Sequence, residues 1–160
     1  MRSELELSLA IERYADMVKR ICMVNLKNYA DTEDIFQTVF LKYTLSNVQF
    51  ETKEHEKAWF IRVTINQCKD LLKNFVRKKT IPLDEVLDLP MEMKEDHREV
   101  FEAIVDLPGK YREIVYLHYY EGYTAPEIAK IMNKNVNTIY TNLTRARSML
   151  RERLGGMADE

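Results

Sequence analysis

The 160-residue chain has few of the residues that turns, cross-links and membrane spans require. It contains four glycines, four prolines and two cysteines, which are too few cysteines for a disulfide framework or a cysteine-based zinc site. No apolar stretch approaches the ~20 residues of a membrane-spanning helix, and the acidic, amphipathic N-terminus is unlike a secretory signal. These absences exclude collagen-like, low-complexity and disulfide-rich proteins, and they favour a cytoplasmic protein without membrane insertion.

The residues that are present favour an all-α protein. Hydrophobic residues make up 46% of the chain and charged residues 31%, with many strong helix formers among them. The formal charge of −2 speaks at first against a nucleic-acid partner, but residues 58–79 carry +5, residues 80–106 carry −7 and residues 134–153 carry +4. Local charge governs the encounter with a polyanion over a Debye length of ~8–10 Å. Two basic segments therefore remain candidates for nucleic-acid binding, with a merely solvated charged face as the alternative.

The N-terminal part of the chain is expected to form two amphipathic helices. Over residues 4–28, apolar residues recur at steps of three and four and indicate a buried stripe. That stripe contains Tyr14, Met17, Val18, Ile21 and Cys22. A second helix over residues 32–45, capped by Asp31 or Thr32, has an apolar stripe and another face that carries Asp34, Gln37 and Leu41. This second face is typical of a surface that docks on another protein.

A third helix, predicted over residues 55–78, combines a core stripe with a basic one. The expected core residues are Ile61, Ile65, Cys68, Leu72 and Phe75. The neighbouring stripe contains Arg62, Asn66, Lys69, Lys73 and Arg77, and Trp59 lies at the start of the helix. Basic side chains neutralise phosphates and aromatic rings stack on unpaired bases, so this stripe suits a nucleic acid. A solvated helix with an ordinary core tryptophan is the alternative.

A linker is expected over residues 80–94, between two small helical domains at residues 1–79 and 95–160. Pro82 and Pro90 disfavour a helix there, the apolar periodicity weakens, and the segment is acidic. The linker is therefore predicted to be a flexible acidic tether.

The C-terminal part has the pattern of a helix-turn-helix. Helices are expected over residues 95–106 and 110–121, with Gly122 ending the second. Thr124 and Glu127 form a capping box that opens a short helix, and residues 133–135 make a polar turn before a long final helix. The exposed side of that last helix carries Asn137, Thr138, Tyr140, Thr141, Thr144, Arg145, Arg147 and Arg151. Small polar residues followed by arginines suit base edges and then phosphates in a major groove, although an ordinary surface helix is the alternative.

These motifs together resemble a known family. Residues 31–40 (DTEDIFQTVF) and 59–66 (WFIRVTIN), with Asp70, resemble region 2 of bacterial sigma factors. Residues 107–114 (LPGKYREI), 119–122 (YYEG), 127–131 (EIAKI) and 138–147 (TIYTNLTRAR) resemble region 4. The resemblance covers about residues 10–154 in the right order, and a chain with these two regions alone is similar to the extracytoplasmic-function (ECF) subgroup.

The resemblance implies a role for each part. Asp34, Gln37 and Leu41 would bind core RNA polymerase. The segment from Phe50 to Lys57 would bind the −10 promoter element together with Trp59, Arg62, Asn66, Lys69, Asp70 and Lys73. The −35 element would be bound by Asn137, Thr138, Tyr140, Thr141, Thr144, Arg145 and Arg147. An anti-sigma factor is a further expected partner. Asn137 stands where the family often has glycine, and Tyr140 stands where many members have a basic residue.

Three functions were weighed against these features. The leading hypothesis is a promoter-specificity factor, which is not an enzyme and needs no cofactor. The second is a stand-alone helix-turn-helix transcription regulator, which the docking face and the Trp59 stripe disfavour. A helical enzyme is the third, but no paired-carboxylate site, Cys–His pair or phosphate-binding glycine loop supports it, and no catalytic or metal-binding residue is assigned. The lone His118 is more typical of a core or surface histidine than of a metal ligand.

Overall fold

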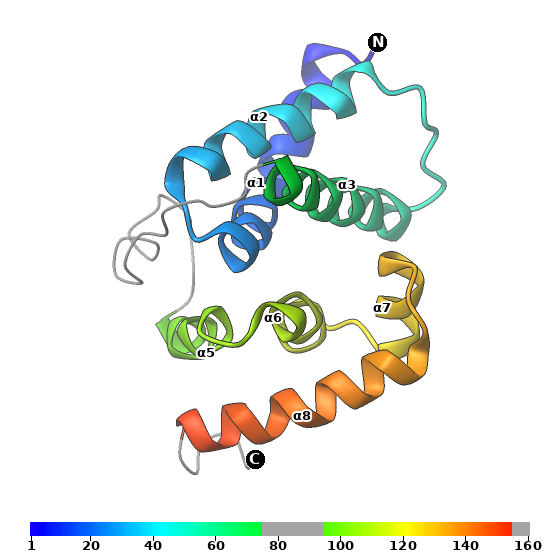
Figure 1. Ribbon diagram of the computed structural model, residues 1–160. Coiled ribbons are helices and arrows are strands. Elements are labelled where there is room, and N and C mark those ends of the chain that lie inside the picture. The colour runs from blue at the N-terminus through cyan, green and yellow to red at the C-terminus, as the bar shows by residue number, and fades with distance from the viewer. Residues whose placement is uncertain (75–94, 155–160) are drawn as a thin grey trace. The chain divides into compact units, whose positions relative to one another are not determined.

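The computed structural model describes residues 1–74 and 95–154, and within these ranges the secondary structure is helical, without strands (Figure 1). The chain divides into two compact units, Met1–Glu92 and Met93–Glu160. The all-α class and the helix-turn-helix are confirmed, whereas the expected linker at residues 80–94 lies outside the described residues. Among the described helices, none combines the length and the apolar character needed to cross a bilayer.

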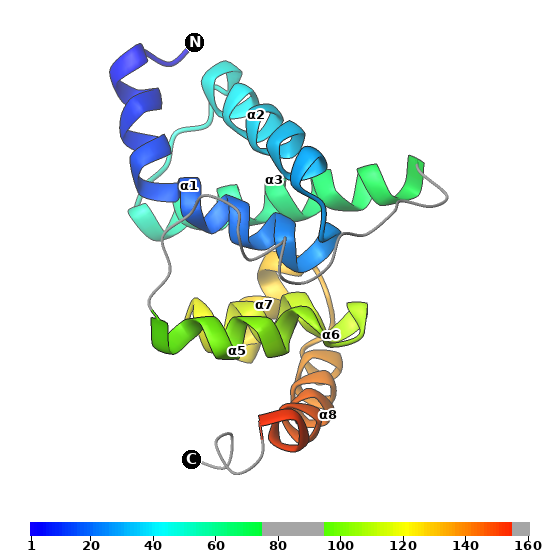
Figure 2. The same cartoon turned by 90° about the vertical axis from the view of Figure 1, so that its left-hand side faces the viewer.

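The first unit is built around α1 (Glu4–Leu26), which packs against both α2 (Tyr29–Leu45) and α3 (Lys53–Asn74) (Figure 2). The apolar stripe predicted for the first helix is buried, as expected from its periodicity. An aromatic cluster joins the three helices, because the ring of Phe60 lies 4.6 Å from Tyr14 and 5.2 Å from Phe40. This cluster holds the start of α3 against the other two helices.

The start of α2 differs from the sequence prediction. Asn28 is the N-cap, and its side chain accepts a hydrogen bond of 3.0 Å from the backbone N–H of Asp31. Asp31 and Thr32, the expected caps, lie inside the first turns and are buried. The Thr32 hydroxyl instead donates to the carbonyl of Asn28 at 2.8 Å. Ending α1 requires the left-handed conformation of Lys27 (φ 51°), and this sharp reversal places Asn28 at the free N–H groups of the next helix.

The core stripe of α3 is shorter than predicted. Ile61, Ile65 and Cys68 are buried, but Leu72, one turn beyond Cys68, is 46% exposed. Phe75 and Arg77 lie outside the described residues. The fully buried stripe of α3 therefore ends at Cys68.

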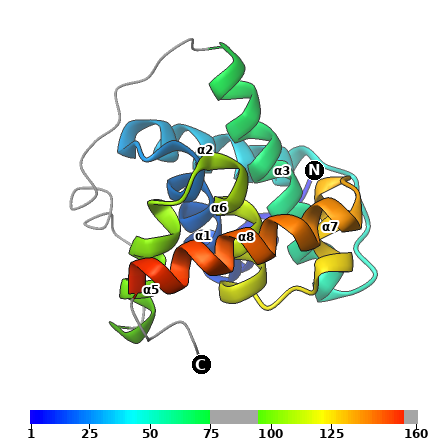
Figure 3. The same ribbon diagram turned by 60° about the horizontal axis from the view of Figure 1, so that its bottom comes forward.

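The second unit contains α5 (Glu95–Val105), α6 (Gly109–Val115), the π-helix η1 (Tyr116–Tyr120), α7 (Ala125–Met132) and α8 (Val136–Leu154). One regular helix was expected over residues 110–121, but its last turn is widened. Glu121 donates its backbone N–H to the carbonyl of Tyr116 at 3.2 Å, five residues back, and Gly122 then ends the helix with φ 82°. Helix α8 lies across α6 and also contacts α7 (Figure 3).

The helix-turn-helix forms for local reasons. Thr124 accepts from the backbone N–H of Glu127 at 3.3 Å, and the Glu127 carboxylate accepts from the backbone N–H of Thr124 at 2.9 Å. This capping box was predicted, and it starts α7 in a fixed direction. Asn133 adopts the left-handed conformation (φ 54°) that ends α7 after eight residues. The tight turn then presents α8 on the surface of the unit.

Candidate nucleic-acid and protein interfaces

Helix α8 presents a continuous polar surface. Ile139, Leu143, Ala146 and Leu150 are buried on its inner side, so the residues between them point outward. Every side chain that the sequence assigned to this surface is exposed, namely Asn137, Thr138, Tyr140, Thr141, Thr144, Arg145, Arg147 and Arg151. At the start of the helix, the Asn135 side chain accepts the backbone N–H of Asn137 at 2.8 Å. The first turn is therefore fixed while its side chains remain accessible.

One arginine of this surface has a partner that the sequence reasoning missed. The Nε of Arg147 donates to the hydroxyl oxygen of Tyr119 at 2.8 Å. Tyr119 comes from the π-helix and is 28 residues away along the chain. A regular helical period does not locate this side chain, because the wide turn changes the direction in which it points. The exposed surface of α8 thus extends onto η1.

Helix α3 presents the second polar surface. Arg62, Asn66, Lys69, Asp70 and Lys73 are exposed on it, as the sequence predicted, while Trp59 is half-buried. The Trp59 ring meets those of Tyr43 and Phe50 edge-on, at centroid distances of 6.0 and 5.9 Å. Trp59 is therefore a member of the aromatic cluster and still has part of its ring at the surface beside the basic stripe.

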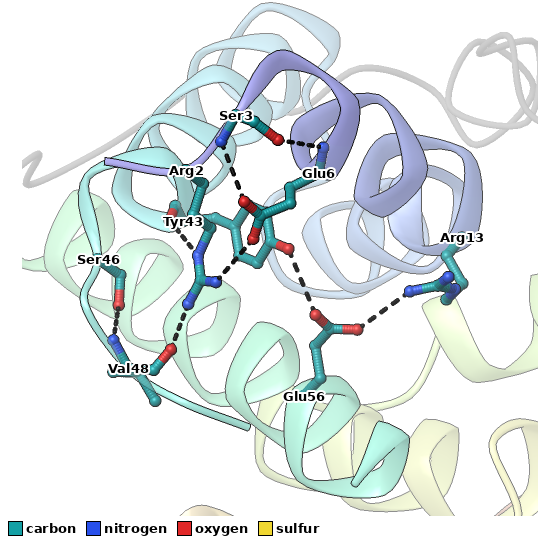
Figure 4. A network of polar contacts seen from close by, with 8 residues as sticks. All are labelled: Arg2, Ser3, Glu6, Arg13, Tyr43, Ser46, Val48 and Glu56. Carbon is teal, nitrogen blue, oxygen red and sulfur yellow. Dashed lines mark hydrogen bonds and ion pairs between the residues drawn. The ribbon is translucent and has the colours of Figure 1, made fainter. Parts of the chain in front are cut away.

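The segment between α2 and α3 is held in place by Arg2 (Figure 4). The guanidinium of Arg2 donates to the carbonyl oxygens of Tyr43, at 3.0 Å, and of Val48. It lies 4.5 Å from the centre of the Tyr43 ring and 5.2 Å from that of Phe50, and it pairs with Glu6 at 3.4 Å. Arg2 therefore stabilises both the end of α2 and the segment that follows it, up to Phe50.

Glu56 holds the other end of the same segment. Its carboxylate accepts a hydrogen bond from the hydroxyl of Tyr43 at 3.4 Å and pairs with Arg13 at 3.3 Å (Figure 4). It also accepts a hydrogen bond of 2.9 Å from the hydroxyl of Tyr14. Burial first, and then the bond to Glu56, raise the pKa of Tyr14. The pKa of Tyr43 is raised by burial and by the nearby Glu56 charge. The first turn of α3 is thereby locked to α1 and α2.

A third surface lies on α2. Asp34, Gln37 and Leu41 are exposed along it, whereas Ile35 and Val39 are buried on the opposite side. Leu41 is 58% exposed, and Leu45, one turn further on, is 59% exposed. The prediction ended at Leu41, although the step of four residues from Gln37 to Leu41 leads directly to Leu45. The surface is therefore longer and more apolar than predicted.

Within residues 1–74 and 95–154, no group of His, Cys, Asp and Glu side chains is arranged to hold a metal ion. His118 is occupied, since its Nδ1 lies 2.8 Å from the carbonyl oxygen of Tyr123. Cys22 and Cys68 are buried and form no disulfide, in keeping with core positions.

Comparison with known proteins assigns the two halves of the chain to two different regions of one family. Residues 10–79 match the family model for Sigma-70 region 2, and residues 91–150 match that for Sigma-70, region 4. RNA polymerase sigma factor SigV of Bacillus subtilis is 32% identical over 139 residues, which cover 84% of this chain and 82% of SigV. The ECF RNA polymerase sigma factor SigW of the same organism is 24% identical, over 90% of this chain and 86% of SigW.

Two solved structures share the fold. Sigma factor RpoE of Bartonella quintana, solved in complex with the anti-sigma factor NepR, has a TM-score of 0.72 over 95% of this chain and 98% of its own. CnrH, solved with the cytosolic domain of CnrY, has a TM-score of 0.64 over 97% of this chain and 91% of its own. Both are 18% identical to this chain, so they support the fold alone.

Proposed function

This chain belongs to the sigma-70 family, in the ECF group of RNA polymerase sigma factors, and from that premise we propose how its three surfaces divide the work. Sigma factors give RNA polymerase its promoter specificity, and this chain is one of them. A stand-alone helix-turn-helix regulator is not favoured, because region 2 is present together with region 4. The proposals below concern the residues and the domains that carry out each step.

Helix α8 is proposed to bind the −35 element as duplex DNA, within a region 4 domain at residues 95–160. Its early residues, from Asn137 to Thr141, would face base edges, and Thr144, Arg145 and Arg147 would follow along the groove and its phosphates. The support is the shared exposure of all seven side chains on one side of the second helix of a helix-turn-helix. No chemistry is required of them, and we propose that the protein contributes recognition and leaves catalysis to the polymerase.

Helix α3 and the segment before it are proposed to bind the −10 element, within a region 2 domain at residues 1–79. Opening the duplex there exposes unpaired bases, which need an aromatic surface and nearby positive charge. Trp59 and the exposed residues Arg62, Asn66, Lys69, Asp70 and Lys73 offer both on one helix. The anchoring of the preceding segment by Arg2 and Glu56 supports this role, because a fixed segment can discriminate between bases.

The α2 surface is proposed to dock on core RNA polymerase. Asp34 and Gln37 supply polar contacts, and Leu41 and Leu45 supply exposed apolar area that docking would cover. We further propose that residues 80–94 form the acidic linker between the two domains. The protein would act in the cytoplasm, where its polymerase works. An anti-sigma factor would bind the protein and keep it from the polymerase; the structurally similar RpoE was solved in complex with such a factor.

A transcription assay tests this assignment. The protein is added to core RNA polymerase with DNA from upstream of its own operon, and a specific run-off transcript is expected. Lys69→Ala and Arg145→Ala should each weaken promoter binding and lower the slope of log affinity against log salt by about one, because each removes a phosphate contact. Lys110→Ala, an exposed lysine outside the three surfaces, is the matched control. A protein that neither binds core polymerase nor directs any transcript would contradict the proposal.

A further inference from the structure

We propose that Tyr119 and Arg147 form one phosphate-binding pair on the −35 duplex, in which Tyr119 orients Arg147 and also donates a hydrogen bond to the DNA backbone. This inference rests on the proposed function of α8 and adds a residue that lies outside the helix-turn-helix. The ligand is a phosphate group of the duplex backbone rather than a base. Tyr119 is thus both a positioning residue and a contact residue.

The geometry leaves the useful part of Arg147 free. Its Nε–H is taken by the Tyr119 hydroxyl at 2.8 Å, which fixes the plane of the guanidinium. The terminal nitrogens remain on an exposed side chain, and Arg147 has no carboxylate partner among the described residues. Elsewhere on α8, by contrast, Arg153 is paired with Asp106 at 2.9 Å. An oriented, unpaired guanidinium fork is what bidentate binding of a phosphate requires.

Tyr119 also has a free donor. Its oxygen accepts the proton of Arg147 Nε, so its own O–H proton is available, and the side chain is 45% exposed. Phosphate oxygens are acceptors only, so they match both the phenol proton and the guanidinium fork. If a carboxylate or carbonyl oxygen of the protein lay beside the Tyr119 hydroxyl, the phenol proton would be expected to bond to that oxygen instead. The O–H of Tyr119 and the terminal N–H groups of Arg147 can therefore both donate to the same phosphate group.

The π-helix holds Tyr119 in this position. Its neighbours Tyr116 and Leu117 are buried and anchor the turn on one side. On the other side, the His118 ring lies edge-on to Tyr119 at 4.8 Å and is itself bonded to the carbonyl of Tyr123 at 2.8 Å. Tyr119 is therefore an exposed residue whose ring is restrained, which lowers the entropy lost when it binds.

The test is a double-mutant cycle on promoter binding by the assembled holoenzyme. The variants are Tyr119→Phe, Arg147→Ala and the double variant, and Tyr29→Phe, 44% exposed in the other unit, is the matched control. Tyr119→Phe should weaken binding about three- to tenfold, equally for different −35 sequences, because a backbone contact carries no sequence information. In the Arg147→Ala background the same change should cost much less.

A phosphate scan makes the assignment specific. Neutral methylphosphonates are placed one at a time along the −35 region of the DNA. At one position the methylphosphonate should lower the affinity of the wild-type holoenzyme relative to unmodified DNA. The same methylphosphonate should lower the affinity of the Tyr119→Phe holoenzyme only slightly, because this variant already lacks the contact. Unchanged core-polymerase binding and thermal unfolding of Tyr119→Phe would show that the loss is local.

Two results would overturn the inference. One is a Tyr119→Phe holoenzyme that binds promoter DNA like wild type, and the other is an equal loss with and without Arg147. If the wild-type holoenzyme itself shows no preference for any −35 sequence, the proposed function of α8 fails instead, so the two failures are distinguishable.

Discussion

Replacing Glu56 by alanine should destabilise the first unit much more than replacing its neighbour Glu54. Glu56 accepts hydrogen bonds from two tyrosines, Tyr14 and Tyr43, that are 5% and 4% exposed. Glu54 lies in the same first turn of α3 but is exposed. Both acidic residues interact similarly with the positive end of the helix, so the comparison isolates the buried hydrogen bonds.

The magnitude follows from those bonds. Leaving a buried hydroxyl without its acceptor costs roughly 1–1.5 kcal/mol at the low end of the range, and two are affected. The ion pair with Arg13 adds at most ~0.5 kcal/mol, because Arg13 is exposed. We therefore expect Glu56→Ala to lower the free energy of unfolding of this unit by about 3 kcal/mol. Glu54→Ala should lower it by no more than ~0.5 kcal/mol.

Trp59 makes the assay specific for this unit. It is the single tryptophan of the chain, it lies one turn from Glu56, and it belongs to the aromatic cluster that unfolding would disperse. Urea titration followed by tryptophan fluorescence therefore reports on the first unit. At a slope of ~1–1.5 kcal/mol per molar urea, Glu56→Ala should lower the midpoint by roughly 2–3 M. Equal midpoints for Glu56→Ala and Glu54→Ala would refute the reasoning.

Three further predictions concern the anchored segment, alkaline pH and polymerase docking. Arg2→Ala should speed hydrogen exchange over residues 46–50 and weaken discrimination between −10 sequences, with core-polymerase binding retained; unchanged exchange would contradict the anchoring role. The raised pKa of Tyr14 favours its protonated form in the folded state, so stability is full below pH ~10 and falls as the pH rises above it. Urea midpoints measured from pH 9 to 11.5 should show this fall, less steeply in Tyr14→Phe, and a flat profile would argue against it. Leu45→Ser should weaken core-polymerase binding about tenfold in a pull-down titration without changing the urea midpoint, and full binding would remove Leu45 from the docking surface.

The features that the sequence predicted are those that depend on local pattern. The stripe from Tyr14 to Cys22, the capping box at Thr124 and the outward side of α8 all follow from periodicity or from residues three positions apart. Each such signal is contained within one helix. Such a signal can be recognised without knowing which residues contact that helix in the folded protein.

The features that were missed depend on contacts between distant residues. Asn28, and not the predicted Asp31, is the N-cap of α2, because the left-handed conformation of Lys27 determines where the chain reverses. Arg2 reaches Val48 across 46 residues, and Arg147 reaches Tyr119 across 28. Leu72 fits the apolar period of α3 but is 46% exposed. A sequence pattern shows that a residue suits a role, whereas tertiary structure decides whether its partner is present.

The distribution of charge has a direct physical consequence for binding. The net charge of −2 arises because residues 80–106 offset two basic segments that contain the exposed surfaces of α3 and α8. Affinity for DNA should therefore depend steeply on salt, as for a basic protein, although the isoelectric point is near 6.0. Total charge is a poor guide to a chain whose surfaces are separated by a segment of opposite sign.

The widened turn at Tyr116–Tyr120 also determines what a change in length would do to this segment. A π-type turn contains one residue more than an α-helical turn, so deleting a single residue would restore the regular period. A different side chain would then occupy the position of Tyr119 and face α8. A relative with one residue fewer here would present another side chain to the position of Arg147 without any substitution. A change in length at this turn would thus alter the α8 surface, even where every side chain of α8 is the same.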